Sequence, residues 1–349
     1  MNVAVVGIRG MGQTHLRGLI NGGLAKNVAG CDISPDVCRD IGAALNIPTF
    51  SSVPQLLNDF KPDAVVIATP PSRHGEVARA CFERGIAVLT EKPIASTLEE
   101  SRALVELAAA KNIPFQCGFQ MRYCGVTRAL QSVIDTGVLG RLSHIGLVQI
   151  SGPHHVKGYM SRARTGGIFY EKHCHQVDIF RYFFGEPTRA IAIAAPNLIN
   201  HYEIEDNVMS VFQFKDGSQG TIAFDTRRAV QIDGLAKPER AIEGRAAGHF
   251  YEMTFSGATG SASYDPWTEV LDVVRYNHRE DLLTERVKQI HVRDEFGEPS
   301  YDTATQDNDF LTHVAAGKSP RHPASDALKS MIWTDKAEES LRKGGEWVS

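Results

Sequence analysis

The chain has 349 residues, of which 42% are hydrophobic and 22% are charged, and its formal net charge at pH 7 is −4. This length is more than one hydrophobic core usually holds together, so we expect two domains. The mildly acidic balance gives no electrostatic basis for binding nucleic acid or an anionic membrane surface. No apolar run approaches the roughly 20 residues of a membrane-spanning helix, which argues against a membrane protein.

The six cysteines show no C-x-x-C pair, and most of them lie within apolar runs. This usage predicts reduced core thiols rather than a disulfide framework. The first predicted strand begins at Asn2, which leaves no room for a basic and then apolar leader segment. We therefore expect a cytoplasmic protein.

A glycine-rich turn follows the first predicted buried strand, residues 3–6. The turn, residues 7–12, opens a helix with apolar spacing over 15–20, and a second strand over 28–31 ends at Asp32. Glycines let the backbone approach a pyrophosphate, and an acid 20 residues after Gly12 can accept hydrogen bonds from the adenosine ribose. The pattern predicts dinucleotide binding, and a purely structural glycine turn is the alternative.

Arg9 stands where the dinucleotide fingerprint has its second glycine. Its side chain must point away from the phosphates or contact the cofactor. The charge of Asp32 would repel a 2′-phosphate, which favours NAD. Arg9 could offset that repulsion, so NADP stays open.

Two further apolar runs, residues 64–68 and 86–89, are predicted to be buried parallel strands separated by a helix over 74–84. Prolines end the first strand, because they donate no ladder hydrogen bond, and Glu91-Lys92-Pro93 follows the second. Ligands bind beyond the carboxyl ends of such strands. We therefore expect residues 69–74 and 91–93 to flank one crevice.

Helices over 40–45, 53–58 and 98–111 and a last strand over 115–120 complete an alternation that predicts a doubly wound parallel sheet. Gln120 would face the same crevice. The residues expected to contact the cofactor are Gly7, Arg9, Gly10, Met11, Gly12, Asp32, Thr69, Pro70, His74, Glu91, Lys92 and Gln120.

The pattern changes after residue 122, so we place a first domain at 1–122 and a second at 123–349. A helix is predicted over 126–135, and two late helices over 307–316 and 324–342. The runs with period-two alternation are 143–151, 188–194, 207–214, 218–225, 250–256, 260–264, 268–276 and 286–292. They predict an α+β domain with a large, mostly antiparallel sheet. Residues 234–248 are left unassigned.

A second group of polar residues lies on a helix predicted over 166–184, where Glu171, His175 and Asp178 share one stripe. A carboxylate one turn from an imidazole can orient the ring and stabilise its protonated form, which suits a general base for an alcohol. Two alternatives remain. His175 could be a structural residue, and Asp178 could fix the helix to neighbouring backbone. A metal held by Glu171, His173 and His175 is disfavoured, because the two histidines diverge on a helix and no cysteine set has zinc spacing.

The loop before this helix, residues 152–164, carries several polar or charged side chains, among them His155, Tyr159 and Arg162. It is interpreted either as a polar wall over the substrate or as a solvated loop.

Several motifs in this order resemble the Gfo/Idh/MocA oxidoreductases, the glucose–fructose oxidoreductase and inositol dehydrogenase family. They are VAVVGIRGMG near the start, ATPPSRH at 68–74, EKP at 91–93, the CGFQMRY…VIDTGVLGRL segment over 117–142, and GGIFYEKHCHQVD at 166–178. The resemblance covers nearly the whole chain. It implies a Rossmann domain followed by an α/β domain whose open sheet often forms homodimers or homotetramers.

The resemblance also implies that Lys92 and His175 are catalytic and that the Lys92–Pro93 bond is cis, the one kind of bond for which cis is cheap. Relatives usually carry aspartate where this chain has Glu171, glycine at position 9 and asparagine at position 120.

The implied activity is NAD(P)-dependent hydride transfer at a hydroxyl carbon of a sugar, sugar derivative or cyclitol. His175 would take the hydroxyl proton, assisted by Glu171, and Lys92 would donate a hydrogen bond to the alkoxide. The residues expected to contact substrate are Lys92, His155, Tyr159, Arg162 and His175. Redox-neutral glycoside cleavage with tightly bound NAD and a non-catalytic sugar or dinucleotide sensor are the alternatives.

Overall fold

The computed structural model describes residues 1–152, 158, 160–226, 250–279 and 282–349. The expectations for His155 and Tyr159 and the unassigned 234–248 segment fall outside these ranges. The chain divides into two compact units. Unit 1 is Met1–Tyr123, Ala163–Gly166 and Asp302–Ile332, and unit 2 is Cys124–Arg162, Gly167–Tyr301 and Trp333–Ser349.

A parallel sheet of six strands, in the order β3-β2-β1-β4-β5-β6, forms the centre of unit 1. Its strands are β1 (Asn2–Val6), β2 (Asn27–Cys31), β3 (Thr49–Phe50), β4 (Ala64–Ile67), β5 (Ala87–Glu91) and β6 (Phe115–Gly118). The direction of winding reverses between β1 and β4, and α/β sheets bind ligands at the carboxyl ends of such strands. The predicted doubly wound parallel sheet is confirmed.

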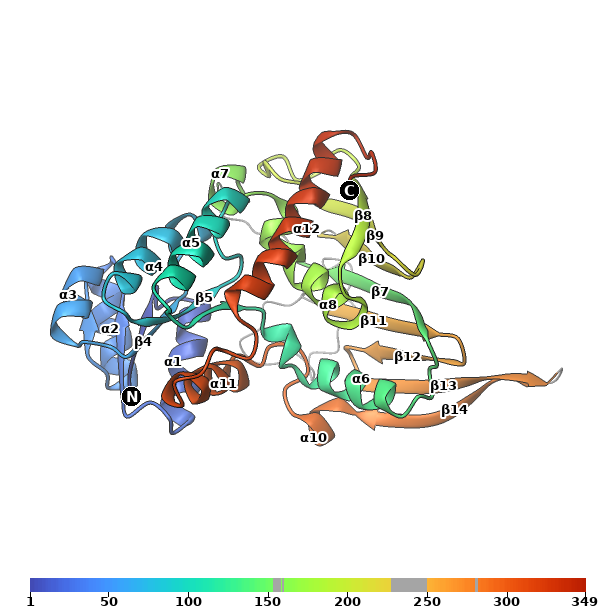
Figure 1. Ribbon diagram of the computed structural model, residues 1–349, viewed down its shortest axis with the longest axis horizontal. Coiled ribbons are helices and arrows are strands. Elements are labelled where there is room, and N and C mark those ends of the chain that lie inside the picture. Colours follow the sequence, from blue (N-terminus) through green and yellow to red (C-terminus); the bar gives the residue numbers. More distant parts are fainter. Residues whose placement is uncertain (153–157, 159, 227–249, 280–281) are drawn as a thin grey trace. The chain divides into compact units, whose positions relative to one another are not determined.

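The sheet of unit 1 is covered by helices, of which α4 and α5 lie side by side (Figure 1). The helices are α1 (Met11–Asn21), α2 (Pro35–Leu45), α3 (Val53–Asp59), α4 (His74–Phe82), α5 (Leu98–Ala110) and α11 (Thr303–Ala315), with 3₁₀ turns η1 (Pro71–Arg73) and η2 (Gln120–Arg122). Hydroxyl side chains begin two of them: Ser52 accepts from the N–H of Gln55 at 3.3 Å, and Thr97 accepts from that of Glu100 at 3.2 Å.

Helix α11 packs into the core of unit 1, although it comes from the far end of the chain. Phe310 and Leu311 are buried in one cluster with Leu16 and Leu19 of α1. The sequence-based division at residues 122 and 123 places this segment in the second domain, whereas its apolar contacts group Asp302–Ile332 with the first unit.

An eight-stranded sheet in the order β14-β13-β12-β11-β7-β10-β9-β8 forms unit 2. Its strands are β7 (Leu142–Ile150), β8 (Pro187–Ile193), β9 (Asn207–Phe214), β10 (Gln219–Asp225), β11 (Phe250–Gly257), β12 (Gly260–Asp265), β13 (Val270–Arg279) and β14 (Leu282–His291). All neighbouring pairs are antiparallel except β7 and β10. The predicted large, mostly antiparallel sheet is confirmed.

One face of this sheet is packed under helices, and Figure 1 shows α6 beside β12 and β13. The helices with residues in unit 2 are α6 (Gly125–Asp135), α7 (Arg162–Thr165), the π-helix η3 (Phe169–His173), α8 (Cys174–Phe184), α10 (Val292–Phe296) and α12 (Ala324–Arg342). On β9, Phe212 lies 5.7 Å from Phe180 of α8 between ring centroids, whereas Met209 is 57% exposed on the opposite face.

All six cysteines are free and buried, as the sequence predicts. Within the described ranges, no helix has both the length and the apolar character needed to cross a bilayer.

Candidate active site

The glycine turn after β1 is tight on one side and open on the other. Gly7 has φ +85°, and a Cβ there would lie 2.7 Å from the Ala68 carbonyl oxygen. A Cβ on Gly12 would lie 1.8 Å from the oxygen of Gly7, so both positions require glycine. A Cβ on Gly10 would meet no heavy atom within 4 Å. The turn therefore packs closely on the end of β4 and leaves open space at Gly10, where Met11 begins α1.

Asp32 follows β2 at the same edge of the sheet. Its Oδ1 accepts a hydrogen bond from the N–H of Ser34 at 3.0 Å, which orients the carboxylate. Arg9 places Nε 4.0 Å from Asp32 Oδ2, and its side chain is 67% exposed. Arg9 thus lies near the acid that would hold the ribose. This position is the one from which Arg9 could offset the repulsion between Asp32 and a 2′-phosphate.

The turn after β4 contains a polar atom suited to a bound ligand. The hydroxyl of Thr69 is buried and has no hydrogen-bond partner within the described part of the protein. Thr69 lies directly against the glycine turn, since a Cβ on Gly7 would be 2.8 Å from its backbone nitrogen. An open glycine backbone, a carboxylate and an unsatisfied hydroxyl at one sheet edge are the groups that a dinucleotide needs.

His74 joins the two turns that the sequence predicts to lie together. Its Nε2 lies 2.8 Å from the Thr69 carbonyl oxygen, and its Nδ1 lies 2.9 Å from that of Pro93. The ring is completely buried, and burial lowers the pKa of His74, although the carbonyl oxygens favour its protonated form. Both ring nitrogens contact backbone carbonyl oxygens. Any effect of His74 on a cofactor would therefore act through the turn that contains Thr69 and Pro70 or through the turn that contains Lys92.

The Lys92 turn begins at the carboxyl end of β5, and its Lys92–Pro93 bond is cis, as the resemblance implies. The N–H of Lys92 donates to Glu91 Oε2 at 3.1 Å. Gln120, which is 2% exposed, begins η2 just after β6. The predicted strand over 115–120 therefore ends at Gly118.

Glu91 also belongs to a buried group of three titratable side chains. His15 of α1 lies between Glu91 and Asp307 of α11, with distances of 3.0 Å from Nε2 to Glu91 Oε1 and 2.7 Å from Nδ1 to Asp307 Oδ2. Burial by itself lowers the pKa of His15, but the two carboxylates outweigh it and raise the pKa to about 10. His15 and Asp307 were not predicted from the sequence, although His15 lies on the buried stripe of α1 with Gly12, where a polar residue needs a partner.

In unit 2, the segment carrying His175 is not the regular helix that the sequence predicts. Residues Phe169–His173 form a π-helix, and α-helix begins only at Cys174. A π-helix bonds each residue to the fifth one on, so the four-residue spacing of Glu171 and His175 no longer defines an α-helical stripe. His175 is 4% exposed and Glu171 is half-buried.

The neighbouring polar side chains of this helix have structural contacts. Asp178 is fully buried, and its Oδ1 lies 3.9 Å from Nη1 of Arg181, one turn on. The ring of His173 packs edge-on against Phe169 and Phe224, with centroids 5.3 Å and 4.8 Å away. Among the residues the structure describes, no group of three or more His, Cys, Asp or Glu side chains has an arrangement that could hold a metal ion.

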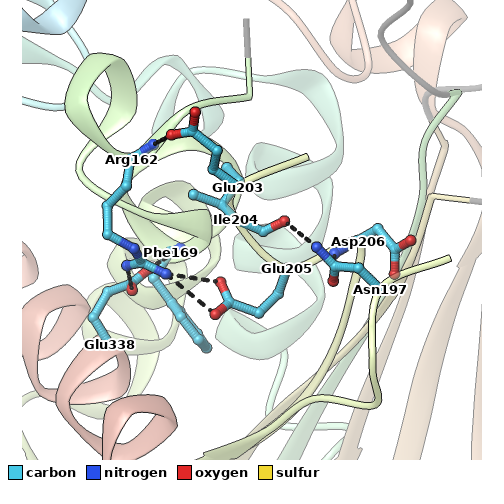
Figure 2. Close-up of polar contacts among 8 residues, drawn as sticks. All are labelled: Arg162, Phe169, Asn197, Glu203, Ile204, Glu205, Asp206 and Glu338. Carbon is cyan, nitrogen blue, oxygen red and sulfur yellow. Dashed lines mark hydrogen bonds and ion pairs between the residues drawn. The ribbon is translucent and has the colours of Figure 1, made fainter. Parts of the chain in front are cut away.

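A buried acid from α12 holds the start of the π-helix (Figure 2). Glu338 Oε1 accepts from the N–H of Phe169 at 2.8 Å, and its Oε2 accepts from Arg162 Nη1 at 2.9 Å. A Cβ on Gly167 would lie 2.2 Å from this carboxylate, so only glycine leaves room for it. Burial raises the pKa of Glu338, whereas the two donors lower it.

Arg162 contacts acids on both sides, because its Nη2 also lies 3.2 Å from Glu205 Oε1. Its contact with substrate stays a prediction. Glu338 was missed by the sequence analysis, although it falls on the stripe of α12 with the buried Ala327 and Met331. Lys92 belongs to unit 1 and His175 to unit 2, so their convergence on one substrate also stays a prediction.

Comparisons with known proteins agree with this arrangement. Residues 1–119 match the family model of Gfo/Idh/MocA oxidoreductases with an NAD-binding Rossmann fold, and residues 127–236 match the Gfo/Idh/MocA C-terminal domain. The rhizopine catabolism protein MocA of Rhizobium meliloti is 26% identical over 229 residues, which are 64% of this chain and 71% of that protein.

The scyllo-inositol 2-dehydrogenase (NAD(+)) of Bacillus subtilis is 27% identical over 226 residues, 63% of this chain and 65% of the relative. The chain thus spans just under two thirds of that relative's length. Levoglucosan dehydrogenase in complex with NADH has the same fold, with a TM-score of 0.81 at 20% identity over 100% of this chain and 98% of the other. The chain belongs to the Gfo/Idh/MocA family of NAD-binding oxidoreductases.

Proposed function

We propose that the protein is an NAD-dependent dehydrogenase that transfers a hydride between the nicotinamide and a hydroxyl carbon of a sugar, sugar derivative or cyclitol. The observation that carries this proposal is the position of Lys92. It follows β5 at the sheet edge where the glycine turn follows β1 and Thr69 follows β4. An ammonium group beside a dinucleotide site is suited to stabilising the oxygen of a carbon that loses hydride.

A bound nicotinamide cofactor would supply the hydride acceptor for oxidation and the hydride donor for reduction. Lys92 donates a hydrogen bond to the substrate oxygen and stabilises its negative charge, or polarises the carbonyl in the reverse direction. His175 accepts the hydroxyl proton, and Glu171 assists it. Positioned acid–base groups of this kind contribute about 10²–10⁴-fold each.

The substrate class is supported by the scyllo-inositol 2-dehydrogenase and the levoglucosan dehydrogenase that the chain resembles, whose substrates are rich in hydroxyl groups. Arg162 is engaged by Glu338 and Glu205, so the contacts that would select a substrate are expected from His155 and Tyr159 as well. The charge of Asp32 supports NAD over NADP. Self-association through the open sheet face, tested by light scattering, is part of the same proposal.

The test is a spectrophotometric screen of polyols, aldoses and cyclitols with NAD and NADP in parallel. We expect reduced nicotinamide to accumulate with at least one compound, faster with NAD. Variants Lys92→Ala and His175→Ala serve as controls, and each should bind NAD yet turn over slowly.

Two outcomes contradict the proposal. A product formed without net cofactor reduction, by protein that retains tightly bound NAD, would indicate redox-neutral cleavage. Binding of NAD and sugar without any product would indicate a sensor. Either result removes the dehydrogenase assignment while leaving the fold and the dinucleotide site intact.

A further inference from the structure

Three buried side chains of unit 1 connect the helix after the glycine turn to the turn that carries Lys92. His15 is 0% exposed, and Glu91 and Asp307 are 6% and 1% exposed. The His15 ring contacts Asp307 through Nδ1 at 2.7 Å and Glu91 through Nε2 at 3.0 Å. His15 therefore bridges α11 and the end of β5.

Glu91 extends this bridge to the backbone of Lys92. One carboxylate oxygen contacts His15, and the other accepts the N–H of Lys92 at 3.1 Å. The two oxygens of a carboxylate move as one planar group, so a ring that holds one of them also sets the direction of the other. The position of His15 thus determines the position of the Lys92 backbone, from which the Lys92 side chain extends.

The charges of the group keep the His15 ring protonated, so that it can donate hydrogen bonds to both acids. Burial alone would lower the pKa of His15, but Asp307 and Glu91 raise it to about 10, so the ring is protonated at neutral pH. Both nitrogens then donate, whereas a neutral imidazole has one N–H only. Without the ring, two buried carboxylates would lose the positive group between them, and Glu91 would be expected to rearrange.

The third member is held in place by helix packing. Helices α1 and α11 approach closely, since a Cβ on Gly18 would lie 3.3 Å from Ala304. Phe310 and Leu311 anchor α11 in the core. On the far side of the Lys92–Pro93 bond, His74 Nδ1 lies 2.9 Å from the Pro93 carbonyl oxygen, so the turn is held at both ends.

We propose that His15 is a positioning residue for Lys92: anchored by Asp307, it fixes Glu91, which in turn fixes the backbone of Lys92. The inference rests on the proposed function only in giving Lys92 a role in hydride transfer. His15 itself is fully buried and acts through Glu91.

The first test needs no turnover. Amide hydrogen exchange at Lys92 is measured in full-length wild type and in His15→Gln, with the amide of Leu89 within β5 as an internal reference. We expect exchange at Lys92 to quicken about tenfold or more, because its acceptor moves, while Leu89 changes little. An unchanged Lys92 amide in a folded His15→Gln protein would overturn the proposal.

The second test is a double-mutant cycle with Glu91. We expect His15→Gln to lower kcat by about ten- to a hundredfold with the KM for NAD within about threefold, since a small misplacement of a catalytic group has effects of this size. In a Glu91→Ala background, His15→Gln should change kcat by less than about twofold, because its effect acts through Glu91. Equal losses in both backgrounds would contradict the proposal.

A matched control separates positioning from loss of helix packing. Asn308 lies beside Asp307 on α11, against Gly22, which directly follows α1. Asn308→Ala should leave kcat and Lys92 exchange near wild type, and an equal effect to that of His15→Gln would overturn the proposal. If His15→Gln does not fold, the isosteric Asp307→Asn is measured in its place, with the same direction expected. Wild-type turnover by Lys92→Ala would remove the proposed function, whereas the exchange result would still decide the role of His15.

Discussion

The two units hold their candidate catalytic side chains in different ways. In unit 1, Lys92 lies on a turn at the end of a strand, and its backbone is fixed by Glu91 on one side and by His74 on the other. In unit 2, His175 lies on a helix whose first turn is a π-helix, and Glu338 holds the start of that turn. A short turn needs contacts at both ends, whereas a helix transmits one contact at its start along its own hydrogen bonds.

The difference also concerns where the supporting residues lie in the sequence. His74 and Glu91 belong to the motifs that flank Lys92, while Glu338 is 169 residues from the Phe169 N–H that it accepts. The direct contact in unit 2 therefore comes from a helix remote in sequence, whereas in unit 1 the remote residue Asp307 acts only through His15 and Glu91. Substitutions in each unit test this difference.

The largest effects are expected from the two candidate catalytic residues themselves. Lys92→Ala and His175→Ala should each lower kcat by about 10²–10⁴-fold, because each removes one acid–base or electrostatic contribution. The dissociation constant for NAD, measured by titration calorimetry, should stay close to wild type in His175→Ala and rise by no more than about tenfold in Lys92→Ala, which also removes one expected cofactor contact. Near-normal kcat in one variant would show that the substituted residue is not catalytic.

Glu338→Ala tests the contacts by which Glu338 holds the start of the π-helix in unit 2. It leaves the buried N–H of Phe169 and one side of Arg162 without their acceptor, so we expect the free energy of unfolding to fall by about 1–3 kcal/mol. The neighbouring Glu339→Ala is the matched control, because its partly exposed pairs with Lys336 and Lys343 contribute about 0–1 kcal/mol. Urea denaturation followed by circular dichroism measures both, and equal losses would contradict a special role for Glu338.

His15 predicts a pH dependence of stability that belongs to unit 1. The unfolded histidine loses its proton near pH 6.5, whereas the folded one keeps it up to about pH 10. The folded state binds more protons in this window, so the contribution of His15 is fully present below pH 6.5 and is lost as pH rises toward 10. The slope is at most about 1.4 kcal/mol per pH unit.

The measurement is urea denaturation at pH 7, 8 and 9 in wild type and His15→Gln. The free energy of unfolding should fall less steeply with pH in the variant, because the contribution from His15 is missing. A variant that declines as steeply as wild type would show that His15 is not the group responsible.

The smallest effect is expected at Arg9. Its contact with Asp32 is long and its side chain is mostly exposed, so Arg9→Ala should change the free energy of unfolding by less than about 0.5 kcal/mol. If Arg9 offsets the charge of Asp32, the variant should use NADP a few-fold less well relative to NAD. Comparing kcat/KM for the two cofactors checks this, and an increased use of NADP would contradict it.

Local patterns in the sequence predicted most of unit 1. The run before Gly7, the glycine turn and Asp32 each depend on neighbours within one βαβ segment, so apolar periodicity and turn residues suffice. The contact between α11 and α1 could not be predicted in this way. This contact depends on which apolar helix face packs against which other. An amphipathic pattern shows that a helix has an apolar face but does not indicate the element it packs against.

The candidate site of unit 2 was less predictable. Apolar spacing over 166–184 indicates a helix, but it does not distinguish an α-turn from the π-turn at Phe169–His173. His15 and Glu338 show the limit for polar residues. A titratable side chain on an apolar stripe signals a buried partner, yet the identity of that partner, Asp307 or Arg162, is set by tertiary packing.

The most direct test of the proposed function follows a labelled hydrogen. Sugars and cyclitols deuterated at their hydroxyl carbons are incubated with NAD and wild-type protein, and the reduced cofactor is analysed by mass spectrometry. We predict reduced cofactor that carries one deuterium with at least one compound, and its loss in Lys92→Ala and His175→Ala variants that still bind NAD. No deuterated cofactor from any compound with NAD-bound wild type, or equal labelling by either variant, would contradict hydride transfer assisted by these two residues.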